Sequence, residues 1–163
     1  HLSMCICTNR SSVNRQMKRY EKLQTWGYML EGPGRPTLAA QRKVLHVLGV
    51  NTADAYGPYW VDVITRGQPG RRAGQFQLAG RNDLLKAVQN GDKLVVAAPY
   101  CLGISQADAA WFIGSLAALG VSLIVSNDAW CVPPGGDAKL LLEEVGRRRN
   151  TVAVASYRKR KSN

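Results

Sequence analysis

The chain has 163 residues and carries 22 lysines and arginines against 11 acidic residues, so its formal net charge is +11. This length fits one domain with enough sequence to bury a core, and a hydrophobic share of 45% is ordinary for a soluble globular protein. No apolar run reaches the roughly 18 residues needed to span a bilayer, and the start lacks a secretory apolar region. We therefore expect a soluble cytoplasmic protein with no membrane partner, or a virion protein if the chain is phage-encoded. The positive excess favours polyanionic partners, nucleic acid first, and a solubilising surface is the simpler alternative.

The first predicted element is a short basic amphipathic helix over residues 13–24. Apolar side chains recur there at helical spacing and basic side chains lie between them. The two sets are Val13, Met17, Tyr20 and Leu23, and Arg15, Lys18, Arg19 and Lys22. We treat residues 1–25 as an N-terminal extension that packs on the domain, contacts a partner or touches a phosphate backbone.

A short strand is expected over residues 26–30, followed by the turn Glu31 to Pro36, which has two glycines and two prolines. Thr37 then leads into a helix that runs to Leu48. A glycine-rich turn between strand and helix can hold an anion, and Arg35 is the candidate contact. The spacing matches neither a P-loop nor a dinucleotide-binding motif.

A second strand is expected over residues 59–64. Tyr56, Trp60 and, further along, Trp130 are either interface anchors or core residues. The segment 65–74 is a glycine-rich basic loop, and a helix is predicted over residues 82–89.

The stretch from Gly91 to Val125 predicts a βαβ unit around which the rest of the chain is arranged. It reads as a buried strand, a turn, an amphipathic helix and a second buried strand, over residues 93–98, 99–105, 106–119 and 121–125. Gly120, just past the helix end, fits a left-handed cap. A parallel pairing of the two strands puts the turn 99–105 at the carboxyl edge of the sheet, where α/β folds bind ligands.

After this unit we predict a short strand over residues 129–132 and a helix over residues 138–149 that Asp137 caps. The apolar side of that helix would carry Leu140, Leu141 and Val145. Residues 151–155 form either its continuation or a strand, and residues 151–163 are a basic tail.

The cysteines Cys5, Cys7, Cys101 and Cys131 show no zinc-binding spacing, and the chain has only two histidines. We expect reduced thiols, no metal and no cofactor. Cys101 lies in the turn 99–105, where it is either an activated thiolate or a small buried hydrophobe.

Two segments, in this order, resemble the catalytic domain of the serine recombinases, the family of resolvases and invertases. The upstream match is formed by Gly27, Tyr28, Thr37, Leu38, Gln41, Leu45, Gly49 and Val50, which resemble the family's opening GYARVST, a short turn, and a helix that closes with GV. The downstream match consists of GDKLVV, a turn containing LG, a helix and LGVSLIV. In the family the corresponding segments read GD-x-LVV, then L-D-R-L-G-R-S, then a helix, then x-G-V, which these segments resemble. The resemblance spans residues 26–150 and implies a resolvase-like α/β domain, three-layered, with a mostly parallel central sheet and helices on both faces.

The residues that carry the family's chemistry differ upstream. Gly32 aligns with the nucleophilic serine, and Leu30 aligns with the arginine two residues before it. Thr37 is a nearby hydroxyl, but a helix cap is the favoured interpretation of it.

The downstream turn has also changed. The family's Asp-Arg pair aligns with Tyr100 and Cys101, and its second arginine aligns with Ile104. Ser105 is again favoured as a helix cap. Because the family's reaction needs a hydroxyl nucleophile and several guanidiniums around the phosphate, we predict that the reaction is absent.

The resemblance also implies roles for basic residues. The family's loop equivalent to residues 65–74 lies near DNA, and an arginine near the start of the next helix contacts phosphate, for which Arg81 is the nearest candidate; a surface residue is the alternative. The counterpart of the helix 138–149 forms a dimer interface in the family. The candidates for contact with nucleic acid are Arg35, Arg66, Arg71, Arg72, Arg81, Arg147, Arg148, Arg149, Arg158, Lys159, Arg160 and Lys161.

These observations predict a pseudoenzyme of the recombinase type that binds DNA or a DNA-associated complex non-specifically, with homo-oligomerisation left open. The tail leaves no room for the helix-turn-helix that small resolvases append, so we expect no sequence-specific reading by that route. The alternative is a structural or assembly protein of a phage particle or mobile-element complex. A third interpretation, an enzyme with different chemistry, would use Tyr100, Cys101 or Ser105, for which no histidine or carboxylate is placed as an activator.

Overall fold

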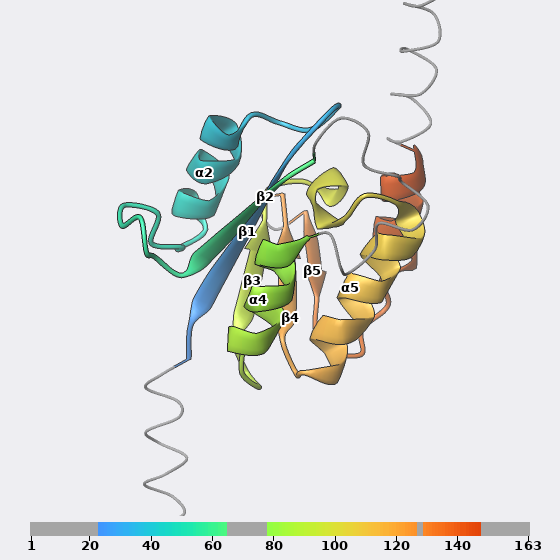
Figure 1. The fold of residues 1–163 in the computed structure, drawn as a ribbon. Helices are drawn as coiled ribbons and strands as arrows, with labels where there is room; N and C mark the ends of the chain where they lie inside the picture. Colours follow the sequence, from blue (N-terminus) through green and yellow to red (C-terminus); the bar gives the residue numbers. More distant parts are fainter. Residues whose placement is uncertain (1–22, 65–77, 127–128, 148–163) are drawn as a thin grey trace, which may run out of the picture.

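The computed structural model describes residues 23–64, 78–126 and 129–147, which form a five-stranded sheet with helices on both faces (Figure 1). The elements in chain order are β1 (Thr25–Glu31), α2 (Leu38–Val47), β2 (Tyr59–Val63), α4 (Ala79–Ala87), β3 (Lys93–Val96), the 3-10 helix η1 (Pro99–Leu102), α5 (Gln106–Ala118), β4 (Ser122–Val125), β5 (Trp130–Val132) and a last helix over residues 139–147. Within these described ranges, no helix is both long enough and apolar enough to span a bilayer.

The strand order in the sheet is β2-β1-β3-β4-β5. The first four strands are mutually parallel, and β5 pairs antiparallel with β4 at the edge. A helix follows each of β1, β2 and β3 before the chain returns as the next parallel strand, which is the connection that parallel pairing requires. The predicted α/β class with a mostly parallel central sheet is confirmed.

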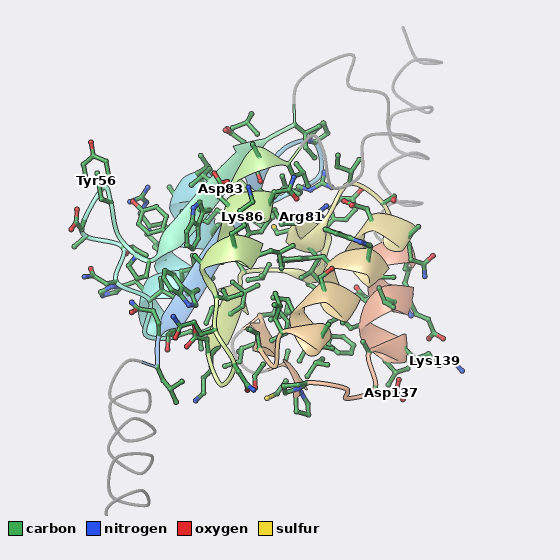
Figure 2. The ribbon with its side chains drawn as sticks, turned by 60° about the horizontal axis from the view of Figure 1, so that its bottom comes forward. Tyr56, Arg81, Asp83, Lys86, Asp137 and Lys139 are labelled. Carbon is green, nitrogen blue, oxygen red and sulfur yellow. The ribbon has the colours of Figure 1, made fainter. Side chains whose placement is uncertain are left out.

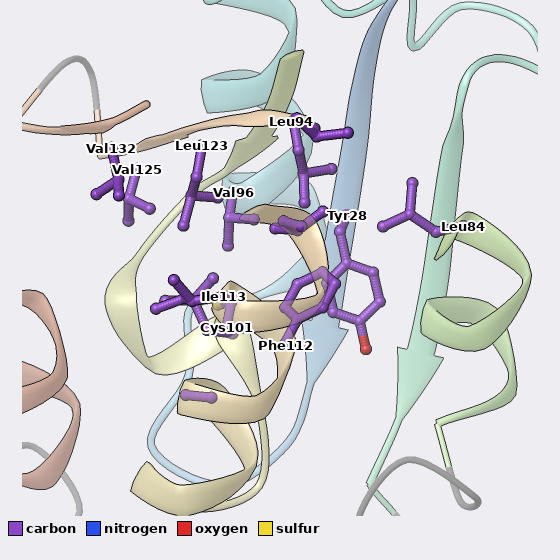
Figure 3. Packing of buried hydrophobic residues seen from close by; sticks show 14 of the residues in the cluster. Tyr28, Leu84, Leu94, Val96, Cys101, Phe112, Ile113, Leu123, Val125 and Val132 are labelled. Carbon is purple, nitrogen blue, oxygen red and sulfur yellow. The ribbon is translucent and has the colours of Figure 1, made fainter. Parts of the chain in front are cut away.

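Side chains of β1 point alternately to the two faces of the sheet, so they contribute to two separate core clusters. Tyr28 and Leu30 belong to a large cluster with side chains from α4, α5 and the last helix, whereas Met29 belongs to a smaller cluster with Leu45 of α2. Successive side chains of a strand point to opposite faces, so helices are needed on both sides to bury them. Figure 3 shows the larger cluster, in which the Tyr28 ring meets the Phe112 ring edge to face at 5.8 Å.

The βαβ unit forms as predicted. Strand β3, helix α5 and strand β4 each end within two residues of the predicted boundary. The Ser105 side chain accepts a hydrogen bond from the Asp108 N–H at 3.1 Å and caps α5, while Gly120 takes the left-handed conformation with φ of 74°. The cap and the glycine fix where the helix begins and ends.

Helix α4 begins at Ala79, three residues before the predicted start at Asn82, so Arg81 lies inside its first turn. The residue before the helix, Leu78, has no side chain that can cap it. Asp62 of β2 supplies the cap instead, since its carboxylate accepts hydrogen bonds from the Gly80 and Arg81 N–H groups, both at 2.8 Å. A cap that comes from another strand leaves no trace in the local sequence.

The last helix is capped as predicted, because Asp137 accepts a hydrogen bond from the Lys139 N–H at 2.9 Å. Leu141 and Val145 are buried, each 1% exposed, but the prediction that Leu140 shares their face is wrong, since it is 66% exposed. Neighbouring residues of a helix lie about 100° apart, so only one of Leu140 and Leu141 can face the sheet. The helix predicted over residues 13–24 does not include Leu23 and Gln24, which are not helical. Its other residues, the continuation of the last helix and residues 151–155 lie outside the described residues.

Candidate functional site

The candidate site lies at the carboxyl edge of the sheet, where β1 and β3 end side by side. The turn Glu31 to Pro36 follows β1, and η1 follows β3; the two strands pair directly in parallel. Adjacent parallel strands deliver their following loops to the same edge, so the two turns meet there (Figure 1).

Arg35 joins these two turns. Its Nε donates a hydrogen bond to the Tyr100 carbonyl at 2.9 Å, and its Nη2 donates to the Gly103 carbonyl at 2.7 Å. Its Nη1 donates to the Pro33 carbonyl at 3.1 Å, and the guanidinium lies 4.4 Å from the centre of the Tyr100 ring. Burial lowers the pKa of Arg35 from its ordinary value. Arg35 therefore acts as a bridge across the edge, and its contact with an anion stays a prediction.

The positions that the resemblance aligns with catalytic groups lie in or beside these two turns. Gly32 has no side chain, and an added Cβ would meet Ile64 at 3.0 Å. Leu30 and Cys101 are fully buried, and Ile104 is half-buried. None of these four side chains carries a hydroxyl or a positive charge, and Tyr100, the fifth aligned residue, carries a buried phenol.

Thr37 and Ser105, the two hydroxyl residues considered as alternative nucleophiles, both act as helix caps, as predicted. Thr37 accepts a hydrogen bond from the Ala40 N–H at 3.2 Å at the start of α2, and Ser105 caps α5. Each hydroxyl oxygen is therefore occupied in holding a helix terminus.

Cys101 is a buried thiol. Burial raises the pKa of Cys101 to about 11, against an opposing effect of the nearby Arg35 charge. Because the thiolate is the reactive form, a thiol that keeps its proton at neutral pH is a poor nucleophile. The interpretation of Cys101 as a small buried hydrophobe is the one that fits its placement.

Arg81 is placed differently from its prediction, since it is fully buried rather than on the surface. Its guanidinium makes a bidentate ion pair with Asp108 of α5, in which Nη2 lies 2.6 Å from Oδ1 and Nη1 lies 2.8 Å from Oδ2. It lies 5.3 Å from the Trp111 ring centre and 5.1 Å from the Phe112 ring centre. A phosphate cannot reach this guanidinium without displacing the carboxylate, so the expected phosphate contact of Arg81 is wrong for this structure.

A buried polar network joins Arg81 to β1 and β2, and the sequence analysis missed it. The Asp62 carboxylate accepts a hydrogen bond from the Tyr28 hydroxyl at 2.7 Å in addition to the two N–H groups of α4. Burial, with the neighbouring Asp62 charge, raises the pKa of Tyr28 above its ordinary value. The network ties α4 and α5 to the sheet and points to a structural role. The signal that could have revealed it is a carboxylate, Asp62, in the middle of an apolar strand.

Of the remaining predicted nucleic-acid contacts, Arg147 is the one that falls in the part of the chain that the structure describes. Arg147 lies exposed on the last helix, with Nη1 at 2.6 Å from Glu144. The other nine lie outside the described residues: Arg66, Arg71, Arg72, Arg148, Arg149, Arg158, Lys159, Arg160 and Lys161. In the described ranges, no three His, Cys, Asp or Glu side chains are grouped so that they could hold a metal ion.

The charge of the described residues differs from that of the rest of the sequence. The described residues contain eight lysines and arginines and nine acidic residues, a formal charge of −1. The other fourteen basic and two acidic residues, with a formal charge of +12, lie in residues 1–22, 65–77, 127–128 and 148–163. The net positive charge of the protein therefore comes from residues outside the described ranges.

The comparisons with known proteins add no relative to this description: no protein-family model matches the chain, and no curated protein is significantly similar to it.

Proposed function

We propose that this chain is a catalytically inactive serine-recombinase-like protein that binds nucleic acid non-specifically through basic segments that lie beyond the described residues. The observation that carries the proposal is the distribution of charge. The described residues have a formal charge of −1, and the other residues of the sequence have a formal charge of +12. Contacts with a phosphate backbone need exposed lysines and arginines but no shaped pocket, because the main gain is the release of counterions from the nucleic acid.

The proposed loss of catalysis is supported by the residues at the carboxyl edge. The turn after β1 offers Gly32 where the resemblance requires a serine, and the buried Leu30 and Cys101 stand where it requires arginines. Without a nucleophile no bond to phosphorus can form, and without cationic groups the charge of the transition state is not stabilised. Strands β1, β3 and β4 pair in parallel, and helices α2 and α5 follow β1 and β3 in the chain. This arrangement is compatible with a resolvase-like core, which stays part of the proposal.

A matched pair of variants tests the binding. The first replaces four tail residues by glutamine: Arg158, Lys159, Arg160 and Lys161. The second replaces four exposed lysines of the body by glutamine: Lys43, Lys86, Lys93 and Lys139. Both lower the formal charge from +11 to about +7. Duplex affinity is measured for each across a range of salt concentrations by fluorescence anisotropy.

We expect the tail variant to reduce the slope of log affinity against log salt by about 3 to 4, since each phosphate contact contributes roughly 0.9. The body variant should keep the slope of the wild type. Equal slopes for the two variants would show that only overall charge matters, and absence of duplex binding at low salt would remove the proposal.

One observation favours the second candidate, a structural or assembly protein. Tyr56 is 97% exposed at the tip of the loop before β2, where its side chain stands clear of the body (Figure 2). Aromatic side chains of this kind often anchor protein interfaces. A defined oligomer without nucleic acid, seen by light scattering and lost in Tyr56→Ser, would favour this candidate.

A further inference from the structure

The amino edge of the sheet, opposite the candidate site, carries an open groove of about 400 Å³. Its lining includes Gln24 and Trp26 of the β1 region, Asp54 and Tyr56 of the loop before β2, and Trp60 of β2. We call it the amino-edge groove. It is separate from the turns that Arg35 joins, because it lies where β1 and β2 begin rather than where they end.

The walls of the groove are aromatic and held in place. The Trp26 and Trp60 rings lie 5.1 Å apart between centres, tilted by 41°, and both residues are half-buried. The Trp26 Nε1 donates a hydrogen bond to the buried Asp92 carboxylate at 2.8 Å, which fixes the indole. Such a surface offers apolar area and ring faces that attract cations.

Asp54 gives the groove a negative charge, and it is the one Asp, Glu, Lys, Arg or His among the lining residues. Its Oδ1 accepts a hydrogen bond from the Tyr56 N–H at 3.0 Å. The groove therefore fits an occupant with apolar side chains and positive charge.

We propose that residues 13–22 of this chain occupy the amino-edge groove. The apolar residues Val13, Met17 and Tyr20 recur at spacings of four and three, so a helix over this segment has one apolar face that needs a partner. Four basic residues of the segment, Arg15, Lys18, Arg19 and Lys22, complement the Asp54 carboxylate and the indole rings.

The position of the segment in the chain supports this occupant. Residue 22 lies directly before Leu23, which is 42% exposed, and the next residue, Gln24, already lines the groove. A tether of one or two residues keeps the segment at a high effective concentration beside the groove, so weak contacts are enough for occupancy.

Limited digestion of the full chain with trypsin tests the proposal. The rates of cleavage after Arg15, Lys18, Arg19 and Lys22 are followed by mass spectrometry and compared with the same bonds in a synthetic peptide of residues 10–24. We expect these bonds to be cut at least about tenfold more slowly in the protein, because a docked segment must open before the protease can bind it.

Two variants and one control sharpen the test. Tyr56→Ser and Asp54→Asn both change exposed residues of the groove, so neither should unfold the body, and both should restore cleavage to near the rate of the peptide. Leu140→Ser, at an exposed apolar site on the last helix, should leave the protection unchanged.

Cleavage of the wild type at the rate of the peptide, or protection that both groove variants leave intact, would overturn the proposal. Protection that grows with protein concentration would assign the groove to the segment of a second copy and would likewise overturn docking within one chain.

Discussion

Asp108→Ala should lower the free energy of unfolding by about 3–5 kcal/mol, because it leaves the fully buried Arg81 guanidinium without its counter-charge. The carboxylate also accepts a hydrogen bond from the Ile104 N–H at 2.9 Å, which would lose its acceptor. Since a domain of this size is stable by roughly 5–15 kcal/mol, the loss is a large part of the total. Urea denaturation followed by circular dichroism measures it.

An exposed ion pair in the same protein provides the control. Arg147→Gln breaks the contact with Glu144, where the Arg147 side chain is 70% exposed, and should cost about 0–1 kcal/mol. The double variant Arg81→Met with Asp108→Leu removes both charges and should recover part of the stability lost in Asp108→Ala. A cost below about 1 kcal/mol for Asp108→Ala would contradict the buried pairing.

Asp62→Ala should cost about 3 kcal/mol, because it leaves the Tyr28 hydroxyl and the Gly80 and Arg81 N–H groups without an acceptor. Tyr28→Phe, which removes only the hydroxyl, should cost about 1 kcal/mol. The same denaturation experiment compares the two. Equal costs would show that the capping of α4 by Asp62 contributes nothing.

The network also makes stability depend on pH. The folded state raises the pKa of Tyr28, by burial first and by Asp62 second, so the folded protein keeps this proton at pH values where the unfolded chain releases it. Its contribution is therefore complete below about pH 10 and falls as the pH rises further. Tyr28→Phe should flatten that decline, and an unchanged alkaline slope in the variant would contradict the assignment.

The parts of the fold that were predictable are those set by local sequence. Strands β3 and β4 are continuous apolar runs, Ser105 caps α5 from the adjacent position, and Gly120 marks its end, so this unit is visible without a structure. Cys101 was placed in the right turn, although its burial needed the packing of η1 to be known.

The network was not predictable because its partners are far apart in the chain. Asp62 is 18 residues from Gly80, and Arg81 is 27 residues from Asp108. From sequence alone, a basic residue near the start of a helix is expected on the surface, because lysines and arginines are rarely buried without a partner. The carboxylate partner of Arg81 is known only from the structure. The neighbouring positions of Trp26 and Trp60 likewise depend on the register of β1 against β2.

Supercoiled plasmid incubated with the full chain at low salt tests the central claim, because one gel reports both binding and cutting. The account predicts that the plasmid is retarded while the protein is present and returns fully supercoiled after the protein is digested away. Nicked or relaxed plasmid, lost in a single point variant of the chain, would contradict it, as would a plasmid that the protein never retards.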